Sequence, residues 1–289
     1  MRRDPRRRSS PAALALAALL ATLATASGCS AQPPTWQLAW EDQFDGPAGT
    51  APDPAYWDYD VGGSGWGNGE LQFYTSRPEN VSLDGAGHLA IVARKEQWQG
   101  RAYTSARINT RGRFEQALGR WEARIRLPAG QGIWPAFWLL GASFPQVGWP
   151  ACGEIDIMEE RGQTPSIVNG TLHAPGYFGG SALTAQYVCN TTTTCSTPPC
   201  TPLCPFDADF HVFAVEVEAN RIRFEVDGAI YHEIHQDRMP LDAAWPFAAP
   251  FFAILNVAVG GAYVGAPNGE TVFPQTMLVD YVRYYRLKP

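Results

Sequence analysis

The sequence is poor in charge, in long apolar runs and in helical periodicity. Only 17% of the 289 residues are charged. The apolar run at residues 11–26 is shorter than the roughly 20 residues that a membrane span needs, which disfavours a transmembrane anchor. No long segment repeats its apolar residues at a helical period, and no internal repeat is present. These absences argue against a helical or repetitive architecture.

Basic residues are concentrated at the N-terminus. "MRRDPRRRSS" carries five arginines and one acid, and an apolar run and "SGCS" follow it. This order is typical of an export signal, here residues 1–28. "ASGC" is similar to a bacterial lipobox, so Cys29 is expected to be lipidated; ordinary cleavage nearby is the alternative. Residues 29–35 then form a short linker and residues 36–289 a single domain, in an extracellular or cell-envelope protein.

Positive charge is scarce in the rest of the chain. Without residues 1–28 the sequence keeps 17 basic and 27 acidic residues, a net charge near −10. Such a chain has little to attract nucleic acid or an anionic membrane. A neutral polar partner fits better, with membrane contact only through the lipid anchor, and a monomer is expected.

Five cysteines follow Cys29, and their spacing fits an exported protein. Cys189, Cys195, Cys200 and Cys204 lie in one Thr/Pro-rich loop, and Cys152 lies beside a group of acids. Closely spaced cysteines in an exported chain predict disulfides. A four-cysteine zinc site is the alternative, although no C-x₂-C pair is present. Five cysteines cannot all pair, and the sequence leaves the pairing open.

Alternating apolar and polar residues predict many short strands. "GRWEARIRLP" and "TMLVDYVRYYRL" alternate, and "FHVFAVEVEANRIRFEVDGAIYHEI" alternates with turn signals at "AN" and "DG". Only a short helical turn, for instance near "DPAYW", is plausible. The pattern indicates an all-β chain built as a two-sheet sandwich or a barrel.

The segment "GEIDIMEE" concentrates acids on one predicted strand. Glu154 and Asp156 are two apart and share a face, with isoleucines on the opposite, buried face. Glu159 is an odd number of residues from Glu154 and would point away on a regular strand. One extra residue in a β-bulge, predicted to be Met158, would return Glu159 to the face of the other two acids.

Neighbouring carboxyls suit acid–base chemistry on sugars. Like charges push pKa values apart, so one carboxyl keeps a proton while another stays ionised. Glycosidases use such a pair, with a carboxyl separation that distinguishes retention from inversion. The spacing alone does not choose between the two outcomes. A solvated acidic edge and a calcium site are the other readings, but a calcium site favours loops with turn glycines.

The same segment resembles the signature of family 16 glycoside hydrolases in its longer form, E-x-D-x-x-E. Over about residues 39–286 further segments are similar, in the same order, to bacterial laminarinases: "WEDQFDG", "GWGNGELQFYT", "YTSARINT", "GRWEARIRLPAGQGIWPAFWLLG", "NGTLHAPGYFGG", "DFHVFAVEVEANRIRFEVDG", "FFAILNVAVGG" and "FPQTMLVDYVRYY". The resemblance implies a concanavalin-like β-jelly-roll sandwich of two antiparallel sheets. It also implies a sugar cleft on the concave face and hydrolysis with retention.

The resemblance also assigns roles to the acids. It implies that Glu154 is the nucleophile, that Glu159 is the general acid/base, and that Asp156 between them hydrogen-bonds the nucleophile. Glu160 lies outside the signature and is expected to be an ordinary polar residue.

Five further positions match cleft residues of the family: Asn68, Arg107, Trp134, Trp138 and His173. The flat tryptophan rings suit the apolar faces of pyranoses, although core packing is the alternative for both. Asn68 and Arg107 match residues that hydrogen-bond sugar hydroxyls, and a structural role is the alternative. Without the resemblance, His173 would be expected to be an ordinary packed or solvated histidine.

The expected activity is endo-hydrolysis of β-1,3-glucan of the laminarin type, with no cofactor for catalysis. The resemblance allows a structural calcium ion held by Glu41, Gly87 and Asp280. The alternatives are a mixed-linkage β-1,3-1,4-glucanase or a transglycosylase on the same scaffold, or a non-catalytic glucan-binding protein.

Overall fold

Strands make up most of the regular structure in the computed structural model, which describes residues 35–190, 203–240 and 243–288. The predicted signal peptide, the lipidation residue Cys29 and nearly all of the linker lie outside the described residues, as do Cys195 and Cys200. Within the described segments, no helix combines the length and the hydropathy needed to cross a membrane.

One sheet of the described chain has ten strands in the order β16-β15-β14-β9-β18-β5-β6-β3, with β1 beside β18 and β4 beside β5. All its pairs are antiparallel except β3 with β6. Its strands are β1 (Trp36–Asp42), β3 (Gln72–Tyr74), β4 (Val81–Leu83), β5 (Leu89–Trp98), β6 (Arg101–Ser105), β9 (Gly119–Arg126), β14 (His211–Glu218), β15 (Arg221–Val226), β16 (Ala229–His235) and β18 (Gln275–Leu287).

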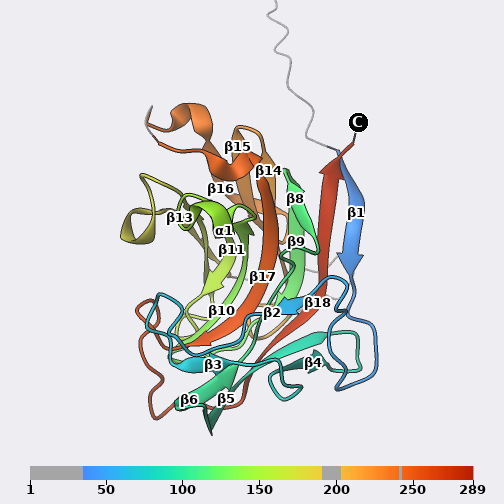
Figure 1. Ribbon diagram of the computed structural model, residues 1–289, viewed down its shortest axis with the longest axis vertical. Helices are drawn as coiled ribbons and strands as arrows, with labels where there is room; N and C mark the ends of the chain where they lie inside the picture. Colours follow the sequence, from blue (N-terminus) through green and yellow to red (C-terminus); the bar gives the residue numbers. More distant parts are fainter. Residues whose placement is uncertain (1–34, 191–202, 241–242, 289) are drawn as a thin grey trace, which may run out of the picture. The chain divides into compact units, whose positions relative to one another are not determined.

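The second sheet has eight strands, all antiparallel, in the order β13-β12-β11-β10-β17-β7-β2, with β8 beside β17. Figure 1 shows β11, β10 and β17 lying side by side. Its strands are β2 (Asp58–Tyr59), β7 (Arg107–Asn109), β8 (Glu115–Ala117), β10 (Ile133–Gly141), β11 (Glu154–Glu160), β12 (Ile167–His173), β13 (Leu183–Val188) and β17 (Pro250–Val259).

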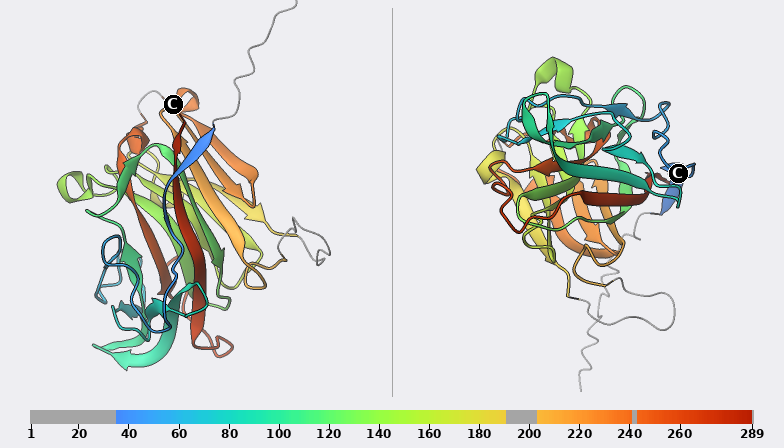
Figure 2. Two further views of the ribbon diagram at one scale, coloured as in Figure 1. Left: turned by 90° about the vertical axis from the view of Figure 1, so that its right-hand side faces the viewer. Right: turned by 90° about the horizontal axis from the view of Figure 1, so that it is seen from below.

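The two sheets pack face to face (Figure 2). One large apolar core is built from buried residues of both sheets. The inward residues of β9, headed by Trp121, are almost fully buried, as the alternation of "GRWEARIRLP" predicts. The segment after Phe210 forms the consecutive hairpins β14, β15 and β16, with turns at "AN" and "DG". The prediction of a two-sheet antiparallel β-sandwich of the jelly-roll type is therefore confirmed.

Helical structure is limited to short turns. The described chain contains α1 (Phe144–Val147) and the 3₁₀ turns η1 (Gly179–Ser181), η2 (Gln236–Arg238) and η3 (Pro246–Ala248). At "DPAYW" the amides of Tyr56 and Trp57 both donate to the carbonyl of Asp53, which closes a single turn.

A β-bulge interrupts β11 between Asp156 and Glu159, as predicted. The prediction of Met158 as the extra residue holds only in part. On the β12 side both Ile157 and Met158 lack a partner, whereas on the β10 side Met158 pairs with Phe137 and only Ile157 is unpaired. Both Ile157 and Met158 are buried in the core. The bulge therefore turns two successive side chains inward, and the following residue, Glu159, returns to the outer face.

Gly170 of β12 lies opposite the bulge, between the residues that pair with Asp156 and Glu159. A Cβ atom on Gly170 would lie 2.4 Å from Tyr231 Oη and 2.7 Å from Phe224 Cδ1. Both aromatic residues belong to the other sheet, so the missing side chain lets the sheets approach closely behind the bulge.

The three cysteines that the structure describes form one disulfide and one buried thiol. Cys189 and Cys204 are bonded, which removes two of the four thiolates that the alternative zinc site would need. Cys152 is free and buried, so it does not join the cysteine-rich loop. The disulfide ties together the two described ends of that loop.

We predict that Gly170→Ala destabilises the protein by about 1–3 kcal/mol, because the new methyl group overpacks the contact with Phe224 and Tyr231. Urea unfolding followed by tryptophan fluorescence measures the change. Gly269→Ala is the matched control, since its Cβ would meet no atom within 4 Å. Equal unfolding midpoints for both variants would contradict the close approach.

Candidate active site

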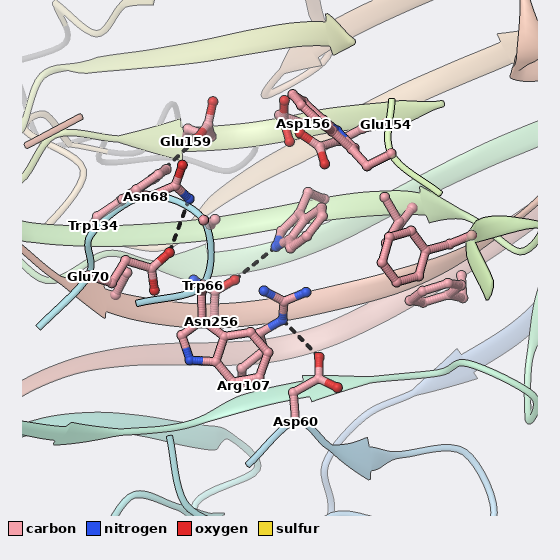
Figure 3. Close-up of a pocket in the computed structure, with 18 of the residues that line it drawn as sticks. Asp60, Trp66, Asn68, Glu70, Arg107, Trp134, Glu154, Asp156, Glu159 and Asn256 are labelled. Atoms are coloured by element: carbon pink, nitrogen blue, oxygen red, sulfur yellow. Dashed lines mark hydrogen bonds and ion pairs between the residues drawn. The ribbon is translucent and has the colours of Figure 1, made fainter. Parts of the chain in front are cut away.

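A cleft of about 470 Å³ lies on the outer face of the eight-stranded sheet. Strands β7, β10, β11 and β17 supply most of its floor, and the segment from Asp60 to Glu70 supplies one wall (Figure 3). The cleft side chains point away from the core because they alternate with inward residues along each strand. Tryptophans, carboxylates and amides together line the cavity, a mixture that suits a polar ligand with flat apolar faces.

Glu154, Asp156 and Glu159 all line this cleft. Their common orientation follows from the bulge, which compensates for the odd spacing between Glu154 and Glu159. Ile155, on the opposite face of the strand, is fully buried in the core. The structure thus places three carboxyls in one row on a rigid apolar support.

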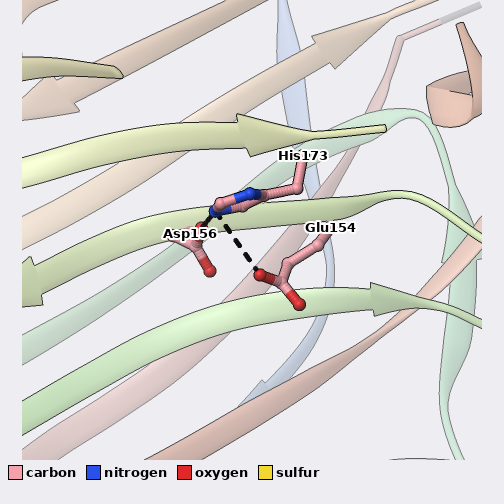
Figure 4. A group of neighbouring side chains, drawn as sticks. All are labelled: Glu154, Asp156 and His173. Carbon is pink, nitrogen blue, oxygen red and sulfur yellow. Dashed lines mark ion pairs between the residues drawn. The ribbon is translucent and has the colours of Figure 1, made fainter. Parts of the chain in front are cut away.

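His173 of β12 lies beside two of the acids (Figure 4). Its Nε2 atom is 3.2 Å from Asp156 Oδ2 and 3.6 Å from Glu154 Oε1. The amide of Gly179 donates to the Nδ1 atom at 3.1 Å. In the neutral ring the hydrogen must therefore be on Nε2, where it faces the two carboxyls. His173 therefore presents its Nε2 atom to the carboxyls of Asp156 and Glu154.

Glu159 is held from the other side by Trp134 of β10. The indole Nε1 donates to Glu159 Oε1 at 3.0 Å. Trp134 packs against Tyr263 with ring centroids 4.9 Å apart, and Tyr263 accepts a hydrogen bond from Asn169. The hydrogen bond from Trp134, whose ring packs against Tyr263, fixes the carboxyl of Glu159 at one position along the cleft.

Burial dominates the protonation of the three acids. It raises the pKa of Glu159 to about 8, with a further contribution from the charge of Asp156. It raises the pKa of Asp156 to about 8 as well, and it raises the pKa of Glu154 well above the ordinary range for glutamate. The hydrogen bond from Trp134 opposes the shift at Glu159 but does not cancel it. Three carboxyls so close together cannot all be ionised at neutral pH, so the row keeps at least one proton.

Arg107 is clamped in the wall of the cleft. Its Nε atom is 2.8 Å from Asp60 Oδ2, and its guanidinium carbon lies 5.0 Å from the ring centroid of Trp66 and 4.7 Å from that of Trp138. Cation–π contacts on both sides and one ion pair restrict this long side chain. Arg107 lines the cavity in this restrained position.

A chain of hydrogen bonds connects the other polar residues of the cleft. Trp138 Nε1 donates to Asn256 at 2.8 Å, and Asn256 donates to the hydroxyl of Tyr74 at 3.2 Å. Tyr74 and Asn68 each donate to the carboxylate of Glu70, at 3.3 and 3.1 Å. Burial raises the pKa of Glu70. The chain fixes the positions of the groups that would meet sugar hydroxyls.

Seven of the eight residues that the sequence places in the active site and cleft line the cavity, and the eighth, His173, contacts two of its acids. Both tryptophans line the cleft and neither belongs to the main core, although Trp138 also packs against a small buried cluster of Leu140, Cys152, Phe252 and Ile254. The sequence reasoning missed other lining residues, namely Asp60, Trp66, Glu70, Phe144, Trp149 and Asn256. Asn256 gave a usable signal, because it is the one amide in the apolar run of β17.

The structure contradicts the prediction for Glu160. It is not an ordinary polar residue, because it is fully buried and neither of its carboxyl oxygens has a hydrogen-bond partner within the described structure. Burial, and then the charge of Asp207, raise the pKa of Glu160 well above its ordinary value. The cause is again the bulge: once Glu159 faces the cleft, the next residue must face the interior.

Two of the three residues predicted to bind calcium have side chains in ion pairs. Glu41 is paired with Arg283 at 2.9 Å, and Asp280 is paired with Arg124 at 2.6 Å. These ion pairs concern side chains only, and backbone carbonyls are also expected calcium ligands, so the structural calcium ion stays a prediction. In the described chain, the one group of three acidic, histidine or cysteine ligand atoms within 4.8 Å of each other is that of Glu154, Asp156 and His173.

The cleft and its row of carboxyls define the class of protein. The family model "Glycosyl hydrolases family 16" matches residues 68–282, and the chain belongs to this family. It is accordingly a glycoside hydrolase, and the alternative of a non-catalytic glucan-binding protein is set aside.

Two curated relatives and one solved structure illustrate the similarity. A "Beta-glucanase" from Rhodothermus marinus is 42% identical over 284 residues, which cover 95% of this chain and 93% of the relative. A "Glucan endo-1,3-beta-glucosidase" from Cryptopygus antarcticus is 35% identical and covers 86% of this chain and 91% of its own length. The catalytic domain of an endo-1,3-beta-glucanase (laminarinase) from Thermotoga petrophila superposes with a TM-score of 0.80 at 43% identity, covering 89% of this chain and all of that domain.

We predict that Glu160→Gln removes a pH-dependent loss of stability. Because the pKa of Glu160 is raised in the folded state, its contribution is fully present below the unfolded pKa near 4.5 and is lost as the pH rises through the folded pKa. Relative to the glutamine variant, the wild type should therefore lose up to about 1.4 kcal/mol of unfolding free energy per pH unit between these values.

Chemical denaturation at pH 5, 6, 7 and 8 measures the difference between the two proteins. Glu79→Gln, at an exposed position, is the control and should follow the wild type at every pH. A constant difference between wild type and Glu160→Gln over this range would contradict a buried, protonated Glu160.

Proposed function

We propose that the chain is an endo-β-1,3-glucanase that hydrolyses laminarin-like glucans with retention at the anomeric carbon. The observation that supports this most is the bulged row of Glu154, Asp156 and Glu159 in the cleft. The names of the relatives point to the same substrate, since they describe glucanases and endo-1,3-β-glucanases.

The proposed reaction uses the two glutamates in two steps. In the first, Glu159 donates its proton to the glycosidic oxygen while the carboxylate of Glu154 bonds to the anomeric carbon and the sugar–oxygen bond breaks. In the second, the ionised Glu159 takes a proton from water, the water oxygen bonds to the anomeric carbon, and Glu154 is released. Transfer to a sugar hydroxyl in place of water would give the alternative transglycosylation.

The neighbours of the two glutamates fit these roles. Trp134 orients the proton donor through its hydrogen bond. Asp156 lies beside Glu154 and shares the contact with His173, so proton sharing within this group can leave Glu154 ionised for attack. Arg107, Asn68 and the ring of Trp138 would bind the sugar next to the cleaved bond.

Export is part of the proposal and is supported by the N-terminal sequence. Residues 1–28 have the features of a signal peptide, and Cys29 is the proposed lipidation residue. The disulfide between Cys189 and Cys204 agrees with an oxidising compartment. We propose a monomer anchored in the cell envelope or released outside it, with no cofactor in the reaction.

Product analysis tests the substrate. We predict that wild-type protein releases short oligosaccharides from laminarin, and that Glu154→Ala lowers kcat by at least about a thousandfold because the nucleophile is lost. Glu79→Ala is the control and should keep full activity. Mixed-linkage β-glucan and agarose are assayed alongside.

Each other outcome has a definite meaning. Cleavage of mixed-linkage glucan with laminarin untouched would keep the two-step mechanism and reject the β-1,3 specificity. No cleavage of any polymer, with the protein folded, would reject the proposed activity.

The pH profile tests the role of Glu159. Because its pKa is raised to about 8 and the protonated form must donate, kcat/KM should fall about tenfold per pH unit above pH 8. Glu160→Gln should leave this limb unchanged, which separates Glu159 from the other buried glutamate. An alkaline limb centred near pH 5 would contradict the raised pKa of Glu159, because an unshifted glutamate titrates in that range.

A further inference from the structure

Exposed aromatic rings are gathered at one end of the cleft. Ten large apolar side chains in the described segments are exposed, and the three aromatic ones among them are Phe144, Trp149 and Phe178, at 36%, 44% and 44%. The other seven are aliphatic residues, and none of them lines the cleft. Exposed rings concentrated at one place are typical of a binding surface.

Trp149 and Phe178 form a corner outside the row of acids. Their ring centroids are 5.4 Å apart and their planes meet at 82°, so the edge of one ring meets the face of the other. Trp149 also lies against His173, with ring centroids 5.9 Å apart. Since His173 contacts Glu154, Trp149 is only one side chain away from the proposed nucleophile.

Only part of this corner belongs to the cleft itself. Phe144 and Trp149 line the cavity, whereas Phe178 does not line it and contacts it through Trp149. Phe178 comes directly before Gly179, whose amide holds His173, so the position of its backbone is tied to the active-site residues. The ring of Phe178 meets that of Trp149, which lines the cavity, and its backbone adjoins the amide that binds His173.

A glucan chain is the occupant that this position fits. The corner of Trp149 and Phe178 adjoins the cleft, because Trp149 belongs to both. The cleft itself combines flat rings with hydrogen-bonding groups, as a sugar ligand requires. A pyranose has apolar faces and a polar rim, so it can stack on a ring while its hydroxyl groups stay in water. A chain too short to leave the cavity would not reach Phe178.

We propose that Trp149 and Phe178 form an additional sugar-binding platform at the Glu154 end of the cleft, which binds a glucosyl unit outside the cavity. This inference rests on the proposed function, because it takes a β-1,3-glucan as the ligand. The platform makes the enzyme prefer long chains, and Phe178 is the residue that determines this preference.

Kinetics on chains of different length test the platform. In Phe178→Ala, KM for laminarin and for linear β-1,3-gluco-oligosaccharides of six or seven units should rise about three- to tenfold, with kcat within about twofold of the wild type. The value of kcat/KM for the trisaccharide should not change. Phe178→Tyr, which keeps a flat ring, should restore the wild-type KM for the long chains.

Ile230→Ala is the matched control, because Ile230 is 50% exposed and lies on β16 of the other sheet. It should change no kinetic constant. An unchanged KM for the long chains in Phe178→Ala, or an equal rise for chains of every length, would overturn the platform while the wild type still cuts laminarin. A wild-type protein that leaves laminarin intact would instead reject the proposed function, and the platform with it.

Discussion

The constraint on which the site depends is the β-bulge in β11. A regular strand would turn either Glu154 or Glu159 into the core, and a buried unpaired carboxylate there would be costly. The bulge sends Ile157 and Met158 inward together, so the apolar back of the strand stays packed while the acids line up in front. Gly170 leaves room for this arrangement from the neighbouring strand. The same geometry has a cost, because it places Glu160 in the interior without a hydrogen-bond partner.

The row of acids works through a balance between burial and directed contacts. Burial alone would protonate all three carboxyls, which would leave no nucleophile. His173 lies beside Glu154 and Asp156, while Trp134 binds Glu159, so the two ends of the row have different neighbours. Arg107, held between two tryptophan rings and Asp60, adds a positive charge on the opposite wall. Different neighbours for similar groups are what acid–base chemistry with two glutamates requires.

Much of the architecture could be predicted from the sequence, because a strand with one buried face must alternate, as β9 and β14 to β16 do. The odd spacing between Glu154 and Glu159 likewise pointed to a bulge. The sequence could not identify Ile157 as the residue that is unpaired with β10, nor the burial of Glu160, since both depend on the register of neighbouring strands. The clamp of Asp60 and Trp66 on Arg107 was missed for a related reason: these residues are far apart in the sequence and meet only in the folded sheet.

The pairing of the first described strand with the last has a practical consequence. Trp36 of β1 lies opposite Leu287 of β18, so both ends of the described chain leave from the ten-stranded sheet (Figure 1). The cleft opens on the outer face of the other sheet. A fusion partner or a solid support joined at either end would therefore be attached to the sheet that does not hold the cleft. Immobilised protein should remain open to polymeric substrates, whichever end is used for coupling.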